Sequence, residues 1–240
     1  MIEKTIIING KPFKYIDESS SISYDNEVIL TEQTARDLIL LSQKLFKNIG
    51  LDIFLTFGTL LGAVREGGLI KWDSDVDVYV EDEDVLLNNL QFLSDNGLKL
   101  CRIIKHQCYS FKTDVGSPAY IDVYIRHACK KYSIWAYKNC RLNNNVTPKH
   151  YFENGTQEID FCGVKCKCVK NPENLLTFWY GKNWRVPVKG HANFIYEIPL
   201  AHFVHTFPKR FLKTIIGYNL WKHIVKPDGK NWWFKTNMNK

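Results

Sequence analysis

The sequence predicts an α+β domain, a mixed β-sheet flanked by helices. Two observations carry this prediction. Segments with helical and with strand periodicity alternate along the first hundred residues, and several strand-like segments then follow one another without an intervening helix. The sequence also shows no internal repeat and no low-complexity segment, which argues against a repeat architecture. A chain of 240 residues is long enough to bury one sizeable core.

Residues 31–49 predict the first helix. Thr31 can cap its start and Gly50 can end it. Its apolar side chains recur at helical spacing, at Leu38, Leu41, Leu45 and Ile49. The residues before it, 5–30, predict short strands and turns. The first ten residues, "MIEKTIIING", read as a strand and a turn and not as a signal peptide.

The remaining elements are predicted from the alternation of apolar and polar residues, from glycines that end helices and from short apolar runs. Two strands and two helices come next, as a strand at 52–57, a helix at 59–66, a strand at 73–80 and a helix at 83–97. Strands are then expected at 98–105, 107–113, 119–126 and 132–138. The last predicted elements are a polar loop over "RLNNNVTPKH", a hairpin around Gly163 and a helix at 172–180.

Three aspartates stand at two-residue spacing in "DSDVDV", as Asp73, Asp75 and Asp77. Alternate residues of a strand share a face, so these three point one way while Val76, Val78 and Val80 point the other way, into a core. In the strand "AYIDVYI", Asp122 likewise lies opposite the apolar residues. If the two strands are neighbours, Asp75, Asp77 and Asp122 converge.

Carboxylates held this close raise one another's pKa unless a cation offsets their charge. Hard oxygen ligands select Mg²⁺ or Mn²⁺, and Mg²⁺ is commonly shared with substrate phosphates. The alternative for any one of these aspartates is a solvated acidic face on a half-exposed strand. Asp73, at the start of the strand, can also cap the turn after Trp72.

The residues before the aspartates point to a phosphate. Gly58 and Thr59 join a strand to a helix, and the first N–H groups of a helix favour a bound anion. Glycine at position 58 lets the backbone approach such a ligand closely. Arg65, less than two turns further on, can bind a phosphate with two hydrogen bonds, or can instead form a surface salt bridge.

This order of motifs resembles the nucleotidyltransferase fold, and "FLTFGTLLGAVREGGLIKWDSDVDVYV" resembles the signature of the LicD family. That family includes bacterial phosphocholine transferases and the fukutin-related ribitol-phosphate transferases. "FCGVKCKCVKNPENLLTFWYGKNWRVP" resembles the family's closing segment, so the likeness covers roughly residues 35–190. The chain departs from the family pattern at Glu66, Lys71 and Ser74, and none of these is an expected metal ligand.

The resemblance implies a metal-dependent phosphotransferase. By position, Asp75 and Asp77 match the metal pair, Asp122 matches the third carboxylate, and Gly58 and Thr59 match the phosphate-binding turn. The implied reaction moves a phospho-alcohol group, such as phosphocholine, ribitol phosphate or glycerol phosphate, from a CDP-activated donor to a hydroxyl. The acceptor is a glycan or a lipid-linked glycan, the hydroxyl loses its proton near the third carboxylate, and CMP leaves.

Two other functions stay open. The first keeps the fold and moves NMP from an NTP, with release of pyrophosphate. The second is a non-catalytic adaptor for a membrane or a nucleic acid, against which the presence of all three aspartates argues.

The net charge of +7 belongs to the C-terminal part of the chain. Residues 208–240 contain eight of the 32 Lys and Arg and one of the 25 acids, so the remainder is neutral. We therefore divide the chain into a catalytic domain, 1–200, and a basic aromatic extension, 201–240. Within the extension the apolar helical face shifts by about half a turn across Gly217, which favours two short amphipathic pieces.

Lysines opposite Trp and Phe suit an anionic membrane surface, and the alternative is that the extension packs on the domain. Nucleic acid is not an expected partner, since no recognition motif is present. No run of about 18 apolar residues predicts a membrane-spanning helix. We expect a cytoplasmic protein, peripheral at a membrane if the extension binds one, and origin from a larger organelle-anchored protein stays open.

The sequence holds seven cysteines, and reduced thiols are the expected state. Cys162, Cys166 and Cys168 cluster around the predicted hairpin. Small apolar hairpin residues are the favoured reading over a zinc site, because the region lacks a second Cys/His pair at the usual spacing.

Overall fold

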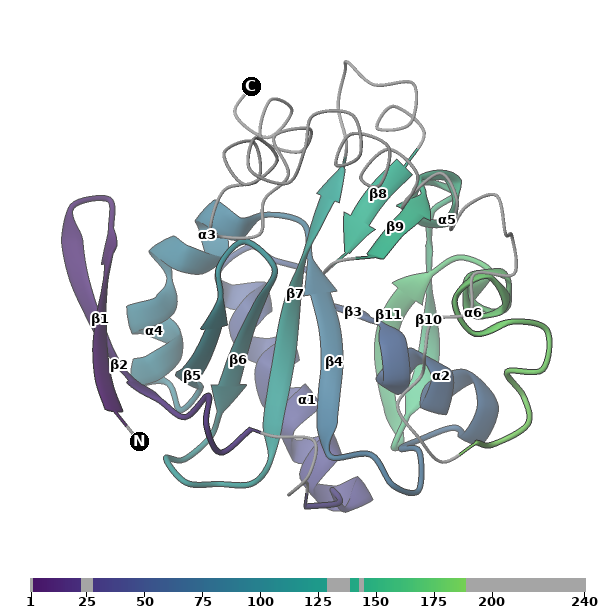
Figure 1. The fold of residues 1–240 in the computed structure, drawn as a ribbon, viewed down its shortest axis with the longest axis horizontal. Helices are drawn as coiled ribbons and strands as arrows, with labels where there is room; N and C mark the ends of the chain where they lie inside the picture. Colours follow the sequence, from purple (N-terminus) through teal and green to yellow (C-terminus); the bar gives the residue numbers. More distant parts are fainter. Residues whose placement is uncertain (1, 23–27, 129–138, 143–144, 189–240) are drawn as a thin grey trace, which may run out of the picture. The chain divides into compact units, whose positions relative to one another are not determined.

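The computed structural model describes residues 2–22, 28–128, 139–142 and 145–188 (Figure 1). The predicted strand at 132–138 and the extension at 201–240 lie outside these residues. The chain divides into two compact units. The first contains residues 1–126, 142–144 and 155–170, and the second contains the rest. All the candidate site residues belong to the first unit.

A mixed sheet forms the centre of the first unit. Seven strands in the described residues hydrogen-bond in the order β10-β11-β3-β4-β7-β6-β5. They are β10 (Thr156–Phe161), β11 (Val164–Val169), β3 (Phe54–Leu55), β4 (Asp75–Val80), β7 (Tyr120–Ala128), β6 (Cys108–Lys112) and β5 (Lys99–Ile104). The pairs β11–β3 and β4–β7 are parallel and the other four are antiparallel. The predicted α+β class with a mixed sheet is therefore confirmed.

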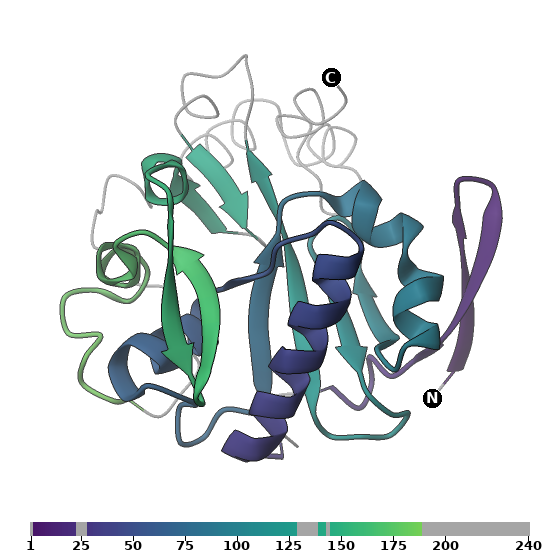
Figure 2. The same cartoon turned by 180° about the vertical axis from the view of Figure 1, so that it is seen from behind.

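Helices cover both faces of this sheet. Helix α1 (Glu32–Asn48) lies across one face, seen in front of β4 and β7 in Figure 2, together with the shorter α3 (Glu83–Asn88) and α4 (Leu90–Asp95). The Thr31 side chain accepts a hydrogen bond from the N–H of Thr34, as predicted for the cap of α1. Helix α2 (Phe57–Glu66) lies on the opposite face and packs against β4 and β10.

The core of the first unit lies on the α1 side of the sheet. The apolar residues that alternate with the aspartates on β4 and β7 are at most 1% exposed: Val76, Val78, Val80, Ile121, Val123 and Ile125. The two-residue period therefore separates the sheet into an apolar face under α1 and a second face that carries carboxylates.

Two strands form a separate hairpin at the N-terminus. Strands β1 (Ile2–Ile8) and β2 (Lys11–Asp17) pair in an antiparallel ladder. Asn9 and Gly10 connect them with φ values of 49° and 79°. Asn-Gly is the pair that a two-residue hairpin turn with positive φ favours, so the predicted strand and turn are present.

One predicted helix, 83–97, is instead two. Asn89 lies between α3 and α4, with φ −112° and ψ 13°. Its side-chain nitrogen donates a hydrogen bond to the carbonyl of Val85, 2.8 Å away. An Asn side chain that bonds to nearby backbone competes with the helical ladder, which accounts for the break.

Two strands are shorter than predicted. The strand expected at 52–57 ends at Leu55, because Thr56 already caps α2. The strand expected at 73–80 begins at Asp75. Asp73 instead donates its N–H to the carbonyl of Ile70, 2.8 Å away, in the preceding turn.

The polar loop expected over "RLNNNVTPKH" was wrong. Strands β8 (Asn139–Leu142) and β9 (Asn145–Pro148) pair with each other, and α5 (His150–Glu153) follows. Cys140, Leu142 and Thr147 are fully buried, so both strands contribute side chains to the interior.

The second unit also contains α6 (Pro172–Tyr180), in the place where the sequence predicts it. Trp179 donates its indole N–H to the Thr147 hydroxyl, 3.0 Å away, and thereby joins α6 to β9. Among the described helices, none combines the length and the apolar character that crossing a membrane requires.

Candidate active site

Three carboxylates meet on the α2 side of the sheet. Asp75 and Asp77 come from β4 and Asp122 from β7, and Asp77 pairs with Asp122 in the parallel ladder. One oxygen of each lies within 4.8 Å of the others. Asp77 and Asp122 are buried and Asp75 is partly exposed. An all-oxygen donor set this compact fits a hard divalent cation such as Mg²⁺ or Mn²⁺.

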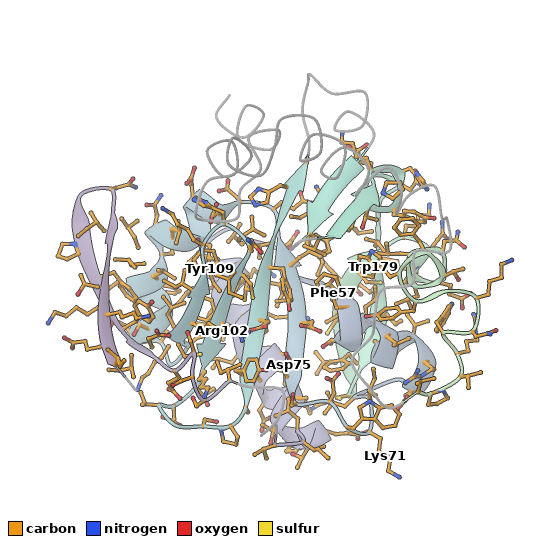
Figure 3. All side chains as sticks on the ribbon, viewed as in Figure 1. Phe57, Lys71, Asp75, Arg102, Tyr109 and Trp179 are labelled. Carbon is orange, nitrogen blue, oxygen red and sulfur yellow. The ribbon has the colours of Figure 1, made fainter. Side chains whose placement is uncertain are left out.

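One rung of the sheet continues from the carboxylates to an arginine. Asp77, Asp122, Ser110 and Arg102 lie opposite one another on β4, β7, β6 and β5. Nη2 of Arg102 donates to Oδ2 of Asp122 at 2.6 Å, and the Ser110 hydroxyl donates to Oδ1 at 2.5 Å. Arg102 and Asp75 are labelled in Figure 3. The sheet thus supplies one positive charge, at Asp122, to the group of three carboxylates.

The start of α2 is bonded directly to Asp77. The N–H of Gly58 donates to Oδ2 of Asp77 at 3.1 Å, and the N–H of Asp77 donates to the Thr59 hydroxyl at 2.7 Å. A Cβ on residue 58 would lie 3.2 Å from Oδ2 of Asp73, closer than most such contacts, and 3.4 Å from Oδ2 of Asp77. Glycine therefore permits the close approach, and its N–H serves a carboxylate in this structure.

The residue before Gly58 has an uncommon backbone conformation. Phe57 has φ 42°, in the left-handed region that a bulky residue seldom adopts. Its ring meets the ring of Tyr124 edge-on, with 4.8 Å between centroids. The Tyr124 hydroxyl donates to Oδ2 of Asp122 at 3.4 Å. Positions of this kind cluster at functional sites, where the surrounding packing holds them in place.

Asp73 lies beside the start of α2, whereas Arg65 lies at its end. The carboxylate of Asp73 lies beside Gly58, since a Cβ on Gly58 would be 3.2 Å from its Oδ2, but Asp73 is not part of the three-carboxylate group. Arg65 lies in the last turn of α2 and pairs with the adjacent Glu66, with Nη2 2.5 Å from Oε1. The structure therefore brings Gly58, Thr59 and Asp73 to the carboxylates and places Arg65 in an ion pair.

Burial sets the electrostatics of Asp77. Desolvation raises the pKa of this carboxyl well above its ordinary value of 3.8, and the charges of Asp73 and Asp122 raise it further. Hydrogen bonds from Gly58 and Tyr124 lower the pKa without offsetting these effects. The Asp77 carboxylate is therefore costly to the folded chain when no cation is bound.

Replacing Asp77 by asparagine is expected to stabilise the metal-free protein at neutral pH. The folded chain binds the Asp77 proton more tightly than the unfolded chain does. Its stabilising contribution is therefore complete below about pH 4 and is lost as the pH rises through the folded-state pKa. Asp77→Asn has no carboxyl that ionises at this position, so the variant does not lose stability in this way. Its melting temperature in EDTA at pH 8 should therefore exceed that of the wild type by a few degrees.

The same measurement at pH 4.5 should show a smaller difference between the two proteins. Asp84→Asn is the matched control, since it removes one exposed carboxylate on α3. An equal rise in melting temperature for Asp84→Asn would indicate a general charge effect and contradict the assignment to Asp77.

Sequence reasoning missed Arg102, Ser110 and Tyr124. Tyr124 stands two residues after Asp122 on a predicted strand, so its place on the same face could have been found. The position of Arg102 could not be predicted in this way, because the ladder between β5 and β6 shifts register between Leu100 and Arg102. A β-bulge of this kind breaks the two-residue period that assigns a side chain to a face.

A family model described as "LicD/FKTN/FKRP, nucleotidyltransferase domain" matches residues 50–171, about half of the chain. The chain belongs to the LicD family. The matched range of this LicD chain begins just before β3 and ends just after β11. It contains the Gly58–Thr59 turn and all three clustered aspartates.

Ribitol-5-phosphate transferase FKTN of Mus musculus is a curated relative of this LicD chain, 22% identical over 187 residues. The match covers 73% of this chain and 37% of the relative, so the chain spans little more than a third of the relative's length.

Similar solved structures include lincosamide antibiotic adenylyltransferase LnuA with bound lincomycin, at 16% identity and TM-score 0.41 over 62% of this chain and 86% of that chain. Antibiotic-resistance factor ANT(2'')-Ia has 14% identity and TM-score 0.41 over 80% and 90% of the two chains.

Proposed function

We propose that this LicD-family chain is a metal-dependent phosphotransferase. It moves a phospho-alcohol group from a CDP-activated donor to a hydroxyl of a glycan acceptor and releases CMP. The observation that carries this proposal is the group of three carboxylates, with oxygens within 4.8 Å, bonded to the start of α2. Family membership and the likeness to a ribitol-5-phosphate transferase support the choice of reaction.

Asp75, Asp77 and Asp122 would hold one or two Mg²⁺ or Mn²⁺ ions. When bound, such an ion supplies a Lewis acid that neutralises the negative charge of a diphosphate. Thr59, whose hydroxyl contacts the backbone of Asp77, and Gly58 would bind a donor phosphate at the start of α2. Arg65 is a further phosphate ligand in this proposal if its ion pair with Glu66 opens.

The proposed reaction exchanges a phosphoanhydride bond of the donor for a phosphoester bond to the acceptor. The acceptor hydroxyl oxygen attacks the phosphorus that carries the alcohol, and the bond from this phosphorus to the bridging oxygen of the diphosphate breaks. CMP leaves with that oxygen, and the hydroxyl proton leaves toward Asp122. The burial of Asp77 and Asp122 keeps water away from two of the three carboxylates and strengthens their electrostatic contacts.

The domain division belongs to the same proposal. Residues 1–200 would form the catalytic domain, and residues 201–240 would form the basic extension. This extension would lie on an anionic membrane surface beside a lipid-linked glycan, because its lysines lie opposite Trp and Phe. A nucleic acid is not an expected partner.

Thermal unfolding with a ligand panel is the first test of this function. A ligand that binds only the folded chain stabilises it by about 2.7 kcal/mol at a hundred times its Kd, which raises the melting temperature by roughly 5–10 °C. We expect such a rise, dependent on Mg²⁺ or Mn²⁺, with one of CDP-choline, CDP-ribitol and CDP-glycerol. Asp75→Asn should abolish it, and CMP should appear when the acceptor is added.

The other arms of the panel are CTP, ATP, GTP and UTP. A rise only with one of these, with pyrophosphate as product, would replace the proposal by an NMP transferase, a chemistry that the family model's "nucleotidyltransferase domain" also fits. A folded sample that responds to no ligand but binds anionic vesicles or RNA would favour the adaptor.

A further inference from the structure

Arg102 is the basic end of the rung that contains two of the three carboxylates. It lies opposite Ser110, which lies opposite Asp122, which lies opposite Asp77. Its side chain is 17% exposed and that of Asp122 is 4% exposed. The arginine therefore belongs to the sheet face of the site and is largely removed from solvent.

The contacts of Arg102 form a closed ring. Two different nitrogens of the guanidinium are used, since Nη2 donates to Oδ2 of Asp122 at 2.6 Å and Nε donates to the Ser110 hydroxyl at 2.9 Å. The Ser110 hydroxyl then donates to Oδ1 of Asp122 at 2.5 Å. Both carboxylate oxygens are thus held from one side, and the rotation of the Asp122 carboxylate is fixed.

Two further features hold the guanidinium. Its carbon lies 5.6 Å from the centroid of the Tyr120 ring, within cation–π range. The register shift between Leu100 and Arg102 places both Cys101 and Arg102 opposite the single residue Ser110. Bulges are enriched beside active sites, where they re-aim a side chain, and this one aims Arg102 at Asp122.

We propose that Arg102 is a positioning residue that, together with Ser110, orients Asp122 as a metal ligand. This inference rests on the proposed function, because it requires a cation at the three carboxylates. A pure counter-charge role has the opposite consequence. Removing a positive charge next to a cation site tightens metal binding by electrostatics alone, whereas removing an orienting partner of a ligand weakens it, typically by about 10–100-fold.

The test is Mn²⁺ affinity, measured by electron paramagnetic resonance on the full chain without nucleotide. We expect Arg102→Gln to weaken Mn²⁺ binding by about 10–100-fold. Arg102→Lys keeps the charge but cannot donate from two fixed nitrogens, so it should also bind Mn²⁺ more weakly than wild type. Ser110→Ala, which removes the third side of the ring, should weaken binding in the same direction.

Arg126→Gln is the matched control, because Arg126 also forms an ion pair, with Glu81, on a strand of the same unit. It should leave Mn²⁺ affinity unchanged. Unchanged or tighter binding by Arg102→Gln would overturn the inference and leave the proposed function standing. If Arg102→Gln does not fold, unchanged affinities of Arg102→Lys and Ser110→Ala would overturn it. Absence of Mn²⁺ binding by the folded wild type would overturn both proposals.

Discussion

Asp75→Asn is expected to lower the rate of group transfer by about three orders of magnitude while the fold stays intact. A neutral amide is a weak ligand for a hard cation, and a metal-stabilised transition state depends on several kcal/mol from that cation. Asp75 is partly exposed at the start of β4, so its loss leaves the core untouched. The measurement is CMP release with the CDP-alcohol that stabilises the wild type, alongside circular dichroism of the variant.

Asp77→Asn should lose activity to a similar extent, although it is expected to be the more stable protein. Asp114→Asn, an exposed carboxylate between β6 and β7, is the control and should keep wild-type activity. Transfer that persists without metal in the double variant Asp75→Asn/Asp77→Asn would refute the assignment of both residues.

The largest expected effect on stability comes from Gly62→Ala. A Cβ built on Gly62 lies 2.4 Å from the carbonyl oxygen of Gly68 and 3.1 Å from the nitrogen of Ile70. Both contacts are backbone atoms, so neither can move aside by a change of rotamer. Overpacking of this kind typically costs about 1–3 kcal/mol and occasionally more, and the urea midpoint should fall accordingly.

Gly68→Ala provides the comparison. It is also a glycine-to-alanine change, at the residue whose carbonyl oxygen meets the Cβ added to Gly62. Its added Cβ meets its nearest atoms, on Cys162 and Glu32, at 3.4 Å, which is ordinary van der Waals distance. We expect a change below about 1 kcal/mol for this variant. Equal urea midpoints for Gly62→Ala and wild type would show that α2 is not held against residues 68–70 in solution.

The carboxylate group could be predicted because its signal is local. Two-residue spacing places Asp75 and Asp77 on one face, and the apolar neighbours of Asp122 give its face in the same way. Whether β4 and β7 lie side by side is a long-range fact that periodicity does not contain. The family resemblance supplied it, and the parallel register Asp77 to Asp122 agrees.

The parts that could not be predicted depend on backbone irregularity or on tertiary packing. Because of the bulge beside Leu100, the two-residue period does not give the face on which Arg102 lies. The positive φ of Phe57 could not be predicted either, because this position is not a glycine. Strands β8 and β9 were not predicted, because the buried residues Cys140 and Thr147 do not belong to an alternating apolar pattern in the sequence. The split of the helix at Asn89 depends on one side-chain hydrogen bond.

The rung from Asp77 to Arg102 also limits how relatives of this chain can vary in length. Its four residues come from four strands, so one inserted or deleted residue inside β4, β5, β6 or β7 moves a neighbouring residue into a site position. In a sequence alignment, gaps should therefore fall in the turns between these strands, whereas the strands themselves should align without gaps. Homologues that place an arginine at position 102 should share the bulge beside it.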